Sequence, residues 1–424
     1  MKENKPLPIK VLLLTHEYGR RITGGLGRVV NGLFKRIPDK IALDIFQIKF
    51  PFPAMIDTTR SYTIEERKDI AYLYRKTDQN KVKCLLNAEY KEVLNNILSD
   101  EKYDIAHVIV NSSIMSECLK EIKNKFPQIK TVYSCHSMAK YEIGVRNNYQ
   151  EELIHEDYIF NNVDYVHLLN GASVQYLKKC YADVAKKEHV FVIPNGIEEE
   201  DFADIDNLFK RDLLNQVRPD KNKIVLCLTR WSFGKGLEYL LDAVPYVLKE
   251  LKNVKFIIAG RKTYSWENNV REYVKIIDEK IEPLRENVIS LGWLENPLRN
   301  AIFSLADICV MPSLLEYFPY GILEPVVCKV PVISSKIESV EELLIENQEC
   351  LFYSPTNSKE LAEKIIYLIK NDELRKSLAS SAFKKVNENY NWQTICKMYE
   401  DMYQKIRVGT TSACPDISPE LTIK

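Results

Sequence analysis

The stretch Met311–Ser335, MPSLLEYFPYGILEPVVCKVPVISS, joins two short apolar runs through a segment that carries two glutamates. The runs, Ile308–Met311 and Val332–Ser334, have the length and the Val and Ile content of buried strands. We expect Glu316 on the loop after the first strand and Glu324 in the first turn of the next helix, with both carboxylates facing one cleft. A first-turn carboxylate also stabilises the helix dipole, so a purely structural role for Glu324 stays open.

Short apolar runs of this kind alternate with long amphipathic segments along the chain, which is typical of strands and crossover helices in a parallel sheet. The first half holds the runs Lys10–Thr15, Asp44–Ile48, Ile105–Val110, Thr131–Cys135, Tyr165–Leu169 and Val190–Ile193. The second half holds Ile224–Leu228, Val254–Ile258, Val288–Leu291, Ile308–Met311 and Val332–Ser334. The sequence therefore predicts an α/β protein with two sets of parallel strands.

The two halves open alike, which indicates two nucleotide-binding-type α/β domains in tandem. In each half, a first strand leads through a loop with arginines and glycines to a helix, expected at Leu26–Arg36 and at Leu237–Leu251. The turn signal Pro194–Asn195–Gly196 and an acidic stretch separate the halves. Near the end, Ser358–Tyr390 has helical periodicity. We expect domains over residues 1–198 and 199–391, a helix over 392–408 and a disordered tail over 409–424.

Composition and charge exclude several classes of protein. The 424 residues are 46% hydrophobic and 28% charged, which is ordinary globular usage. The 59 Lys and Arg residues balance the 59 Asp and Glu residues, so we expect no nucleic-acid partner. The ten cysteines lie singly, without zinc-site spacing, and are expected to be reduced. The first apolar run, Val11–Leu14, is too short for a signal sequence or a membrane span, so we expect a cytoplasmic protein.

Two loops have the residue types that bind phosphate groups. Gly24–Gly25–Leu26–Gly27 lies before a predicted helix, whose free amides bind anions and whose glycines allow close approach. A packing turn is the alternative, and the glycine order fits neither a dinucleotide nor a Walker-type site. In the second half, Arg230 and Lys235 flank a strand-to-helix loop and could neutralise a diphosphate, although a solvated surface pair is the alternative. Both loops follow opening strands, so the two sheets could converge on one cleft.

Together these motifs resemble the GT-B glycosyltransferases, specifically the retaining family-4 type (glycosyl transferases group 1), with some likeness to glycogen and starch synthases. The resemblance spans nearly the whole chain. It rests on the glycine run, on Pro194–Asn195–Gly196 and on His136, Arg230, Lys235, Gly260, Gly292, Pro312, Ser313, Glu316, Phe318, Glu324, Pro331 and Val332. It implies a GT-B fold, with two Rossmann-like parallel-sheet domains facing across a cleft and the helix over 392–408 crossing back to the first domain.

The resemblance also implies that a UDP-, GDP- or ADP-sugar binds mostly to the second domain. Glu324 would accept hydrogen bonds from the ribose hydroxyls, and Arg230 and Lys235 would neutralise the diphosphate. Gly24 and Gly25 would reach the phosphates or the sugar from the opposite domain. Further donor contacts would come from the backbone at the start of one helix, at Tyr320, Gly321, Ile322 and Leu323.

By the same resemblance, Glu316 would face the donor sugar and His136 would lie near the sugar and the acceptor. Fixed cations and amides stabilise a leaving diphosphate without a metal, so we expect no metal and no cofactor. Retention by front-face attack lets the departing phosphate take the proton, so Glu316 is not a glycosidase-type nucleophile. Weaker acceptor-side candidates are His16, which could equally cap a turn, and Tyr141, Arg146 and His155, expected on a loop after His136.

The sequence departs from the family pattern at a few positions. Pro319 replaces a glycine and removes an amide donor. Ile22 stands where glycogen synthases carry a lysine, and Arg28 replaces their aspartate, which argues against a standard glycogen synthase. Two further histidines, His107 and His167, lie inside strand patterns and are expected to be structural.

We therefore expect a metal-independent retaining glycosyltransferase that moves a hexosyl-type sugar from a nucleotide-diphosphate sugar to an acceptor hydroxyl. The alternatives are a catalytically silent nucleotide- or sugar-binding GT-B protein, a GT-B nucleotide-sugar epimerase and an inverting transferase. Nothing in the sequence selects the donor nucleotide or the acceptor. No transmembrane segment is expected, and a peripheral membrane contact stays open.

Overall fold

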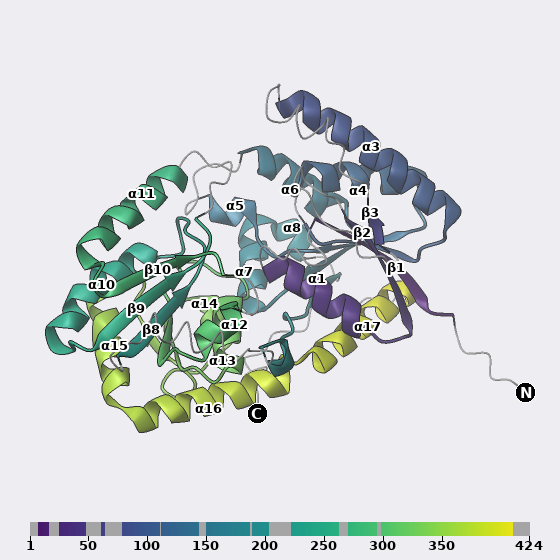
Figure 1. The fold of residues 1–424 in the computed structure, drawn as a ribbon. Coiled ribbons are helices and arrows are strands. Elements are labelled where there is room, and N and C mark those ends of the chain that lie inside the picture. The colour runs from purple at the N-terminus through teal and green to yellow at the C-terminus, as the bar shows by residue number, and fades with distance from the viewer. Residues whose placement is uncertain are drawn as a thin grey trace, which may run out of the picture. The chain divides into compact units, whose positions relative to one another are not determined.

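The computed structural model describes residues 7–16, 25–47, 61–63, 79–110, 112–143, 150–186, 189–202, 222–262, 270–294 and 298–409 (Figure 1). The chain divides into two compact units. The first holds Met1–Ile143, Tyr149–Gly196 and Trp392–Lys424, and the second holds Gly144–Asn148 and Ile197–Asn391. The chain therefore enters the second unit directly after the turn signal Pro194–Asn195–Gly196 and returns to the first unit at Trp392.

The first unit is built on a seven-stranded parallel sheet in the order β3-β2-β1-β4-β5-β6-β7. Its strands are β1 (Ile9–Thr15), β2 (Ile41–Gln47), β3 (Ser61–Thr63), β4 (Ile105–Val108), β5 (Lys130–Ser134), β6 (Tyr165–Leu168) and β7 (Val190–Val192). Helices cover both faces of a parallel sheet, which is why β1 and β4 are apolar and buried almost throughout. The strand order reverses between β1 and β4.

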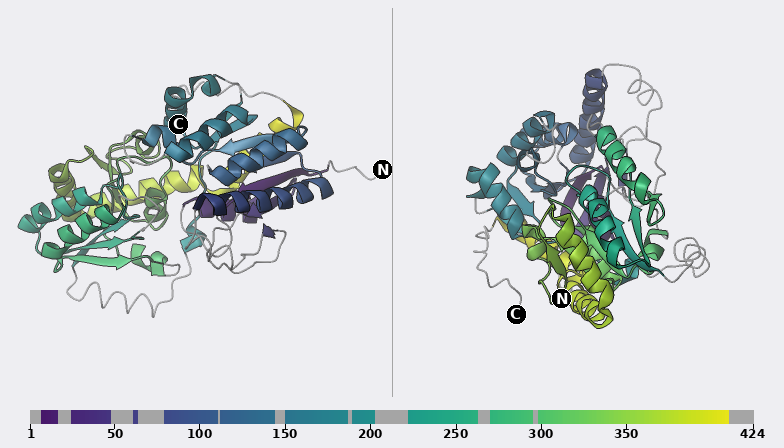
Figure 2. Two further views of the ribbon diagram at one scale, coloured as in Figure 1. Left: turned by 90° about the horizontal axis from the view of Figure 1, so that it is seen from above. Right: turned by 90° about the vertical axis from the view of Figure 1, so that its left-hand side faces the viewer.

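The helices of the first unit connect these strands and are seen from two further sides in Figure 2. They are α1 (Gly25–Arg36), α3 (Gln79–Asp100), α4 (Ser113–Lys125), α5 (Ala139–Glu142), α6 (Gln150–Asn162), α7 (Gly171–Cys180), α8 (Ala182–Ala185) and α17 (Trp392–Val408). Side chains cap two of them, because Ser112 accepts a hydrogen bond from an amide of α4 and Asn170 from an amide of α7. None of the helices in the described ranges is long and apolar enough to cross a membrane.

The second unit has a six-stranded parallel sheet in the order β10-β9-β8-β11-β12-β13. Its strands are β8 (Lys223–Leu228), β9 (Val254–Ala259), β10 (Val288–Gly292), β11 (Ile308–Met311), β12 (Val332–Ser335) and β13 (Leu351–Tyr353). Its α-helices are α10 (Leu237–Glu250), α11 (Val270–Ile281), α12 (Leu298–Phe303), α13 (Tyr320–Val327), α14 (Glu338–Glu341), α15 (Ser358–Lys370) and α16 (Asp372–Asn389). Two short 3-10 turns, η1 (Glu199–Phe202) and η2 (Glu282–Leu284), complete it.

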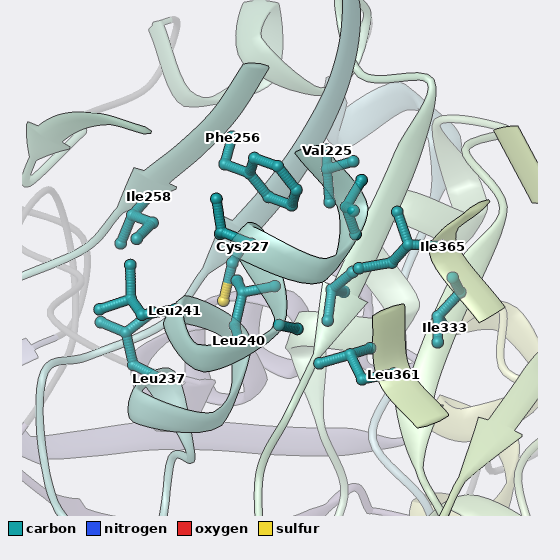
Figure 3. Close-up of a cluster of buried hydrophobic side chains, with 14 of the residues drawn as sticks. Val225, Cys227, Leu237, Leu240, Leu241, Phe256, Ile258, Ile333, Leu361 and Ile365 are labelled. Atoms are coloured by element: carbon teal, nitrogen blue, oxygen red, sulfur yellow. The ribbon is translucent and has the colours of Figure 1, made fainter. Parts of the chain in front are cut away.

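One apolar core fixes the sheet of the second unit against α10 and α15 (Figure 3). Alternate side chains of β8 and β9 point into it, and so does one face of each helix. The labelled members are Val225, Cys227, Leu237, Leu240, Leu241, Phe256, Ile258, Ile333, Leu361 and Ile365, all of which are buried. This packing holds the carboxyl ends of β8 and β11 in place, and it thereby fixes the positions from which the following loops start.

Every strand expected from the sequence overlaps an observed strand, while β3 and β13, each of three residues, are additions. The expected helical stretch Ser358–Tyr390 is in fact two helices, α15 and α16, separated at Asn371. The break is stabilised by the buried Arg375, whose guanidinium donates to the backbone oxygens of Leu368 and Ile369. Carbonyls at the end of a helix lack partners in the next turn, and Arg375 supplies donors to two of them, in addition to the Asn371 amide that donates to Leu368.

Trp392, the first residue of α17, packs between two glycines. A Cβ built on Gly32 of α1 would lie 2.0 Å from Cζ2 of Trp392, and a Cβ on Gly196 would lie 2.5 Å from its Cδ2. Trp392 is itself buried. Glycine at both positions therefore creates the slot for the indole that anchors α17 to the first unit.

A chain of hydrogen bonds links α17 to three strands of the same unit. Tyr403 Oη lies 2.7 Å from Nδ1 of His107, and Nε2 of His107 lies 2.6 Å from Oγ of Ser134. Ser134 Oγ lies 2.5 Å from Nδ1 of His167, whose Nε2 lies 2.8 Å from the backbone oxygen of Ile193. The Ile193 carbonyl can only accept, so His167 Nε2 donates to it. His167 Nδ1 then accepts from Ser134 Oγ, and Ser134 Oγ accepts from His107 Nε2. His107 Nδ1 in turn accepts from the hydroxyl of Tyr403.

The imidazole rings of His107 and His167, which belong to this chain of hydrogen bonds, are both neutral. Burial lowers the pKa of His107 well below its ordinary value, with the nearby His167 and His136 adding to the effect, and burial lowers the pKa of His167 to about 4. The expectation that His107 and His167 are structural residues agrees with this arrangement.

From the packing of Trp392 against Gly32 we predict how Gly32→Ala changes the stability of the protein. Helix propensity alone would make this substitution stabilising by up to about 1 kcal/mol. The clash with the indole reverses the sign, and we expect a loss of about 1–3 kcal/mol in the free energy of unfolding, measured by urea denaturation. Lys35→Ala, on the exposed side of the same helix, should change it by less than about 0.5 kcal/mol. A stabilised Gly32→Ala protein would contradict the packing described above.

The neutral histidines predict how stability depends on pH. An unfolded histidine has a pKa near 6.5, whereas the folded His107 and His167 resist protonation, so acid favours the unfolded chain. Their contribution is complete above pH 6.5 and is lost as the pH falls toward 4. We expect urea denaturation to give about 1 kcal/mol less stability for each ring at pH 5.5 than at pH 6.5. Equal stability at the two pH values would mean that the rings are not buried in the neutral form.

Candidate functional site

The strand order of the second unit reverses between β8 and β11, and ligands of open α/β sheets bind beside the carboxyl ends of strands at such a reversal. The loop after β8 carries Arg230 and Lys235, and the loop after β11 carries Ser313 and Glu316. The residues expected at a phosphate and sugar site therefore come from the two loops that flank this point.

The two loops are tied together through their backbones. The amide of Leu314 donates to the backbone oxygen of Gly234 at 2.8 Å. Gly236 has a φ of 65°, and a Cβ there would lie 1.9 Å from the backbone oxygen of Pro312. Only glycine satisfies both the left-handed conformation and this close approach. The position of Lys235 is thus set by its two neighbouring glycines.

Lys235 and Glu316 form an ion pair across the two loops. Lys235 Nζ lies 2.6 Å from Oε1 of Glu316, and Ser313 Oγ donates to the same oxygen at 2.7 Å. The side chains are only 11% and 16% exposed. Burial opposes ionisation of Glu316, but the ammonium of Lys235, the Ser313 hydroxyl and the charge of Arg230 outweigh it and hold the pKa of Glu316 below its ordinary value. Glu316 is therefore a carboxylate at neutral pH and a hydrogen-bond acceptor.

Arg230 differs from Lys235 in its surroundings. Its side chain is exposed, and no carboxylate in the described ranges forms an ion pair with it. The sequence grouped the two cations together, whereas the structure leaves the guanidinium as the cation with donors to offer. An arginine fork with open donors matches the geometry of a phosphate group.

Glu324 is placed differently from the sequence-based expectation. The helix α13 begins at Tyr320, directly after Pro319, so Glu324 lies in its second turn and not in the first. The side chain is 2% exposed and forms an ion pair with Arg299 of α12. A dipole role at the helix start is thereby excluded. Arg299 could not be identified from the sequence, because an arginine inside a short amphipathic segment is ordinary.

The start of α13 supplies fewer free amides than expected. The amides of Ile322 and Leu323 both donate to the backbone oxygen of Pro319, at 3.0 and 3.2 Å. Both amides are thus used within the helix, and their contact with the donor stays a prediction. Tyr320 and Gly321 occupy the first two positions of α13, where the helix itself provides no acceptor for the amides.

The first unit places His16, Gly25 and His136 at the carboxyl edge of its sheet. His16 directly follows β1, Gly25 is the first residue of α1, and His136 follows β5. Gly24 and Arg146 lie outside the described residues. His136 Nε2 is buried and has no hydrogen-bond partner among the described residues. Burial, together with the nearby His167, lowers the pKa of His136 to about 3, so its imidazole is neutral at pH 7.

The expectation that Tyr141 and His155 lie on a loop is wrong. Tyr141 belongs to α5, and its ring stacks on Tyr176 of α7 with 4.0 Å between the ring centroids. His155 belongs to α6, and its Nδ1 lies 3.0 Å from Oγ of Ser116 on α4. Both side chains therefore take part in helix packing. Tyr141 lies in a helix of only four residues, which is too short to show a helical pattern, whereas His155 lies in α6, which has 13 residues.

Across the described ranges, no three His, Cys, Asp or Glu side chains gather into a set that could hold a metal ion.

Known proteins are similar to this chain in sequence, one of them over nearly the full length. Residues 210–385 match the family glycosyl transferases group 1. An uncharacterized glycosyltransferase of Methanocaldococcus jannaschii is 24% identical over 407 residues, which are 93% of this chain and 98% of that protein. An N-acetylgalactosaminyltransferase of Campylobacter jejuni that acts on N,N'-diacetylbacillosaminyl-diphospho-undecaprenol is 23% identical, over 80% of this chain and 86% of its own.

Solved glycosyltransferase structures have the same fold. Sucrose-phosphate synthase from Thermosynechococcus elongatus superposes with a TM-score of 0.74 at 19% identity and covers 95% of this chain and 100% of its own. Anabaena HepE in complex with UDP-glucose gives a TM-score of 0.69 at 19% identity, over 93% of this chain and all of its own. Residues 210–385 thus match the glycosyl transferases group 1, and the two parallel-sheet units have the fold of the GT-B glycosyltransferases.

Proposed function

We propose that this protein is a retaining glycosyltransferase that moves a hexosyl-type sugar from a nucleotide-diphosphate sugar to an acceptor hydroxyl without a metal ion. The observation that carries the proposal is the pair of loops after β8 and β11, which brings an open guanidinium and a paired lysine and glutamate to one edge of the sheet. Such a set provides positive charge for a diphosphate and a carboxylate for sugar hydroxyls.

In this proposal Arg230 and Lys235 share the charge of the diphosphate. Arg230 binds a phosphate through its open donors. Lys235 exchanges part of its contact with Glu316 for a phosphate oxygen, which requires little movement because the ion pair lies on the same edge. The two fixed cations stabilise the charge that develops on the leaving group, which is the task a divalent ion performs in other transferases.

Glu316 is suited to hold the sugar. Its Oε1 accepts from both Lys235 and Ser313, whereas its Oε2 has no hydrogen bond to a described residue. A carboxylate oxygen of this kind accepts hydrogen bonds from vicinal hydroxyls of a hexose. The lowered pKa keeps Glu316 charged, so it does not serve as the acid, and the departing phosphate takes the proton of the acceptor hydroxyl.

His136 and the compartment complete the proposal. The neutral imidazole, with its unpaired Nε2, forms a hydrogen bond with the donor sugar or the acceptor when they bind. The eight cysteines whose side chains the structure describes are free, which fits a reducing compartment, so we place the enzyme in the cytoplasm. Because Anabaena HepE has been solved with UDP and with UDP-glucose, UDP-sugars are the first donors to test.

Donor binding should depend on Arg230. We expect one of UDP, GDP or ADP, or its sugar conjugate, to raise the melting temperature without a divalent ion, because a ligand that binds the folded state stabilises it. Arg230→Ala should weaken the affinity for that nucleotide roughly 10- to 100-fold, as expected for loss of a charged hydrogen bond of about 1.5–3 kcal/mol. The control is Arg285→Ala, an exposed arginine of the same unit. An unchanged affinity in Arg230→Ala would remove the diphosphate from this loop.

Glu316→Gln should separate binding from transfer. Removing the negative charge releases Lys235 from its partner, so the affinity for UDP should stay equal or increase, as measured by isothermal titration calorimetry. Turnover, measured as nucleotide release from the sugar conjugate, should fall by roughly 100-fold because the sugar loses its charged acceptor. If UDP affinity falls in parallel with turnover, Glu316 acts only as a structural support for Lys235.

A further inference from the structure

Glu156 is a buried carboxylate that the proposed reaction does not use. It lies on α6, and its side chain is 0% exposed. Its Oε2 accepts from the amide of Ala139 at 2.5 Å, and its Oε1 accepts from the amide of Lys140 at 3.0 Å and from Oη of Tyr181 at 2.8 Å. Burial raises the pKa of Glu156, and these three donors oppose the rise.

Two of these donors belong to the first turn of α5. Ala139 and Lys140 are the first two residues of that helix, and the residue before them, Met138, provides no side-chain cap. A carboxylate from a different helix therefore does what a local Ser, Asp or Asn would otherwise do. The result is that α5 is fixed to α6 and, through Tyr181, to the segment between α7 and α8.

The loop that is fixed in this way carries His136. Only His136, Ser137 and Met138 separate Cys135 from α5. At one end, the amide of Cys135 donates to the backbone oxygen of His167 at 2.9 Å. At the other end, Met138 is buried and α5 is held by Glu156. Because His136 Nε2 has no partner in the described residues, the backbone sets the ring position from these two ends.

We propose that Glu156 is a positioning residue for His136: by holding the first amides of α5, it fixes the three-residue loop that presents the imidazole to the substrates. This inference rests on the proposed function only for the role of His136 in transfer. The placement of the ring by Glu156 can be tested without any turnover.

The first test uses Glu156→Gln and records histidine ring signals by NMR and amide hydrogen exchange. Glutamine has only one acceptor oxygen. Its NH₂ group would face a backbone N–H from which the carboxylate of Glu156 accepts a hydrogen bond, and two donors cannot bond to each other. We expect Ala139 and Lys140 to exchange at least 10-fold faster and the ring signals of His136 to shift, with the affinity for UDP within twofold of the wild type. Glu152→Gln, on the exposed side of the same helix, is the matched control and should change none of these.

Tyr181→Phe covers the case in which Glu156→Gln does not fold. It removes one of the three donors and leaves both amides in place, so we expect a smaller shift of the His136 signals in the same direction. Unchanged His136 signals in a folded variant that has lost the amide protection would overturn the proposal.

The second test is a double-mutant cycle on turnover with the sugar nucleotide identified by the binding screen. If Glu156 acts through His136, Glu156→Gln lowers turnover roughly 10- to 100-fold in the wild type and less than twofold in His136→Ala. Additive losses would show that Glu156 acts by another route and would overturn positioning. Full turnover in His136→Ala would instead overturn the proposed role of His136, while the ring signals still decide whether Glu156 places it.

Discussion

The reversal of strand order between β8 and β11 is the constraint on which the site depends. In a parallel sheet every strand ends at the same edge, and crossover connections on either side of the reversal leave in opposite directions. Among the strands that the structure describes in the second unit, β8 and β11 are the two whose following loops flank the point where the order reverses. Segments 81 residues apart, at Lys235 and Glu316, can meet there with a 2.6 Å contact. The glycines on either side of Lys235 position this contact. A side chain at Gly236 would clash with the backbone oxygen of Pro312.

The fold was largely predictable because burial on both faces makes each strand of a parallel sheet an uninterrupted apolar run. The exceptions, β3 and β13, have three residues each, whereas the equally short β7 lies within the apolar run Val190–Ile193. The position of Glu324 was misjudged for a local reason. Its helix begins directly after Pro319, earlier than expected, which moves the carboxylate from the first turn to the second.

The candidate site was less predictable because its partners are set by tertiary packing. The sequence identified the residue types of Arg230, Lys235 and Glu316, but it could not show that Glu316 neutralises Lys235 and leaves Arg230 open. Arg299, the partner of Glu324, and Glu156, which caps a helix other than its own, have no local signature at all. A four-residue helix such as α5 is also too short to show a pattern in the sequence, which is why Tyr141 was expected on a loop.

Glu316 of the second unit and the buried histidines of the first unit are held in opposite charge states by their surroundings. Glu316 is 16% exposed and stays charged because Lys235 and the Ser313 hydroxyl lie beside it. In the first unit, His107 and His167 are fully enclosed and neutral, and the chain of hydrogen bonds from Tyr403 ends at the carbonyl of Ile193, which cannot take up a proton. His136 meets His167 only edge to face, with 6.4 Å between the ring centroids. Because the pKa of His136 is lowered to about 3, its imidazole is a weak base, and in the proposed reaction the proton of the acceptor leaves with the phosphate.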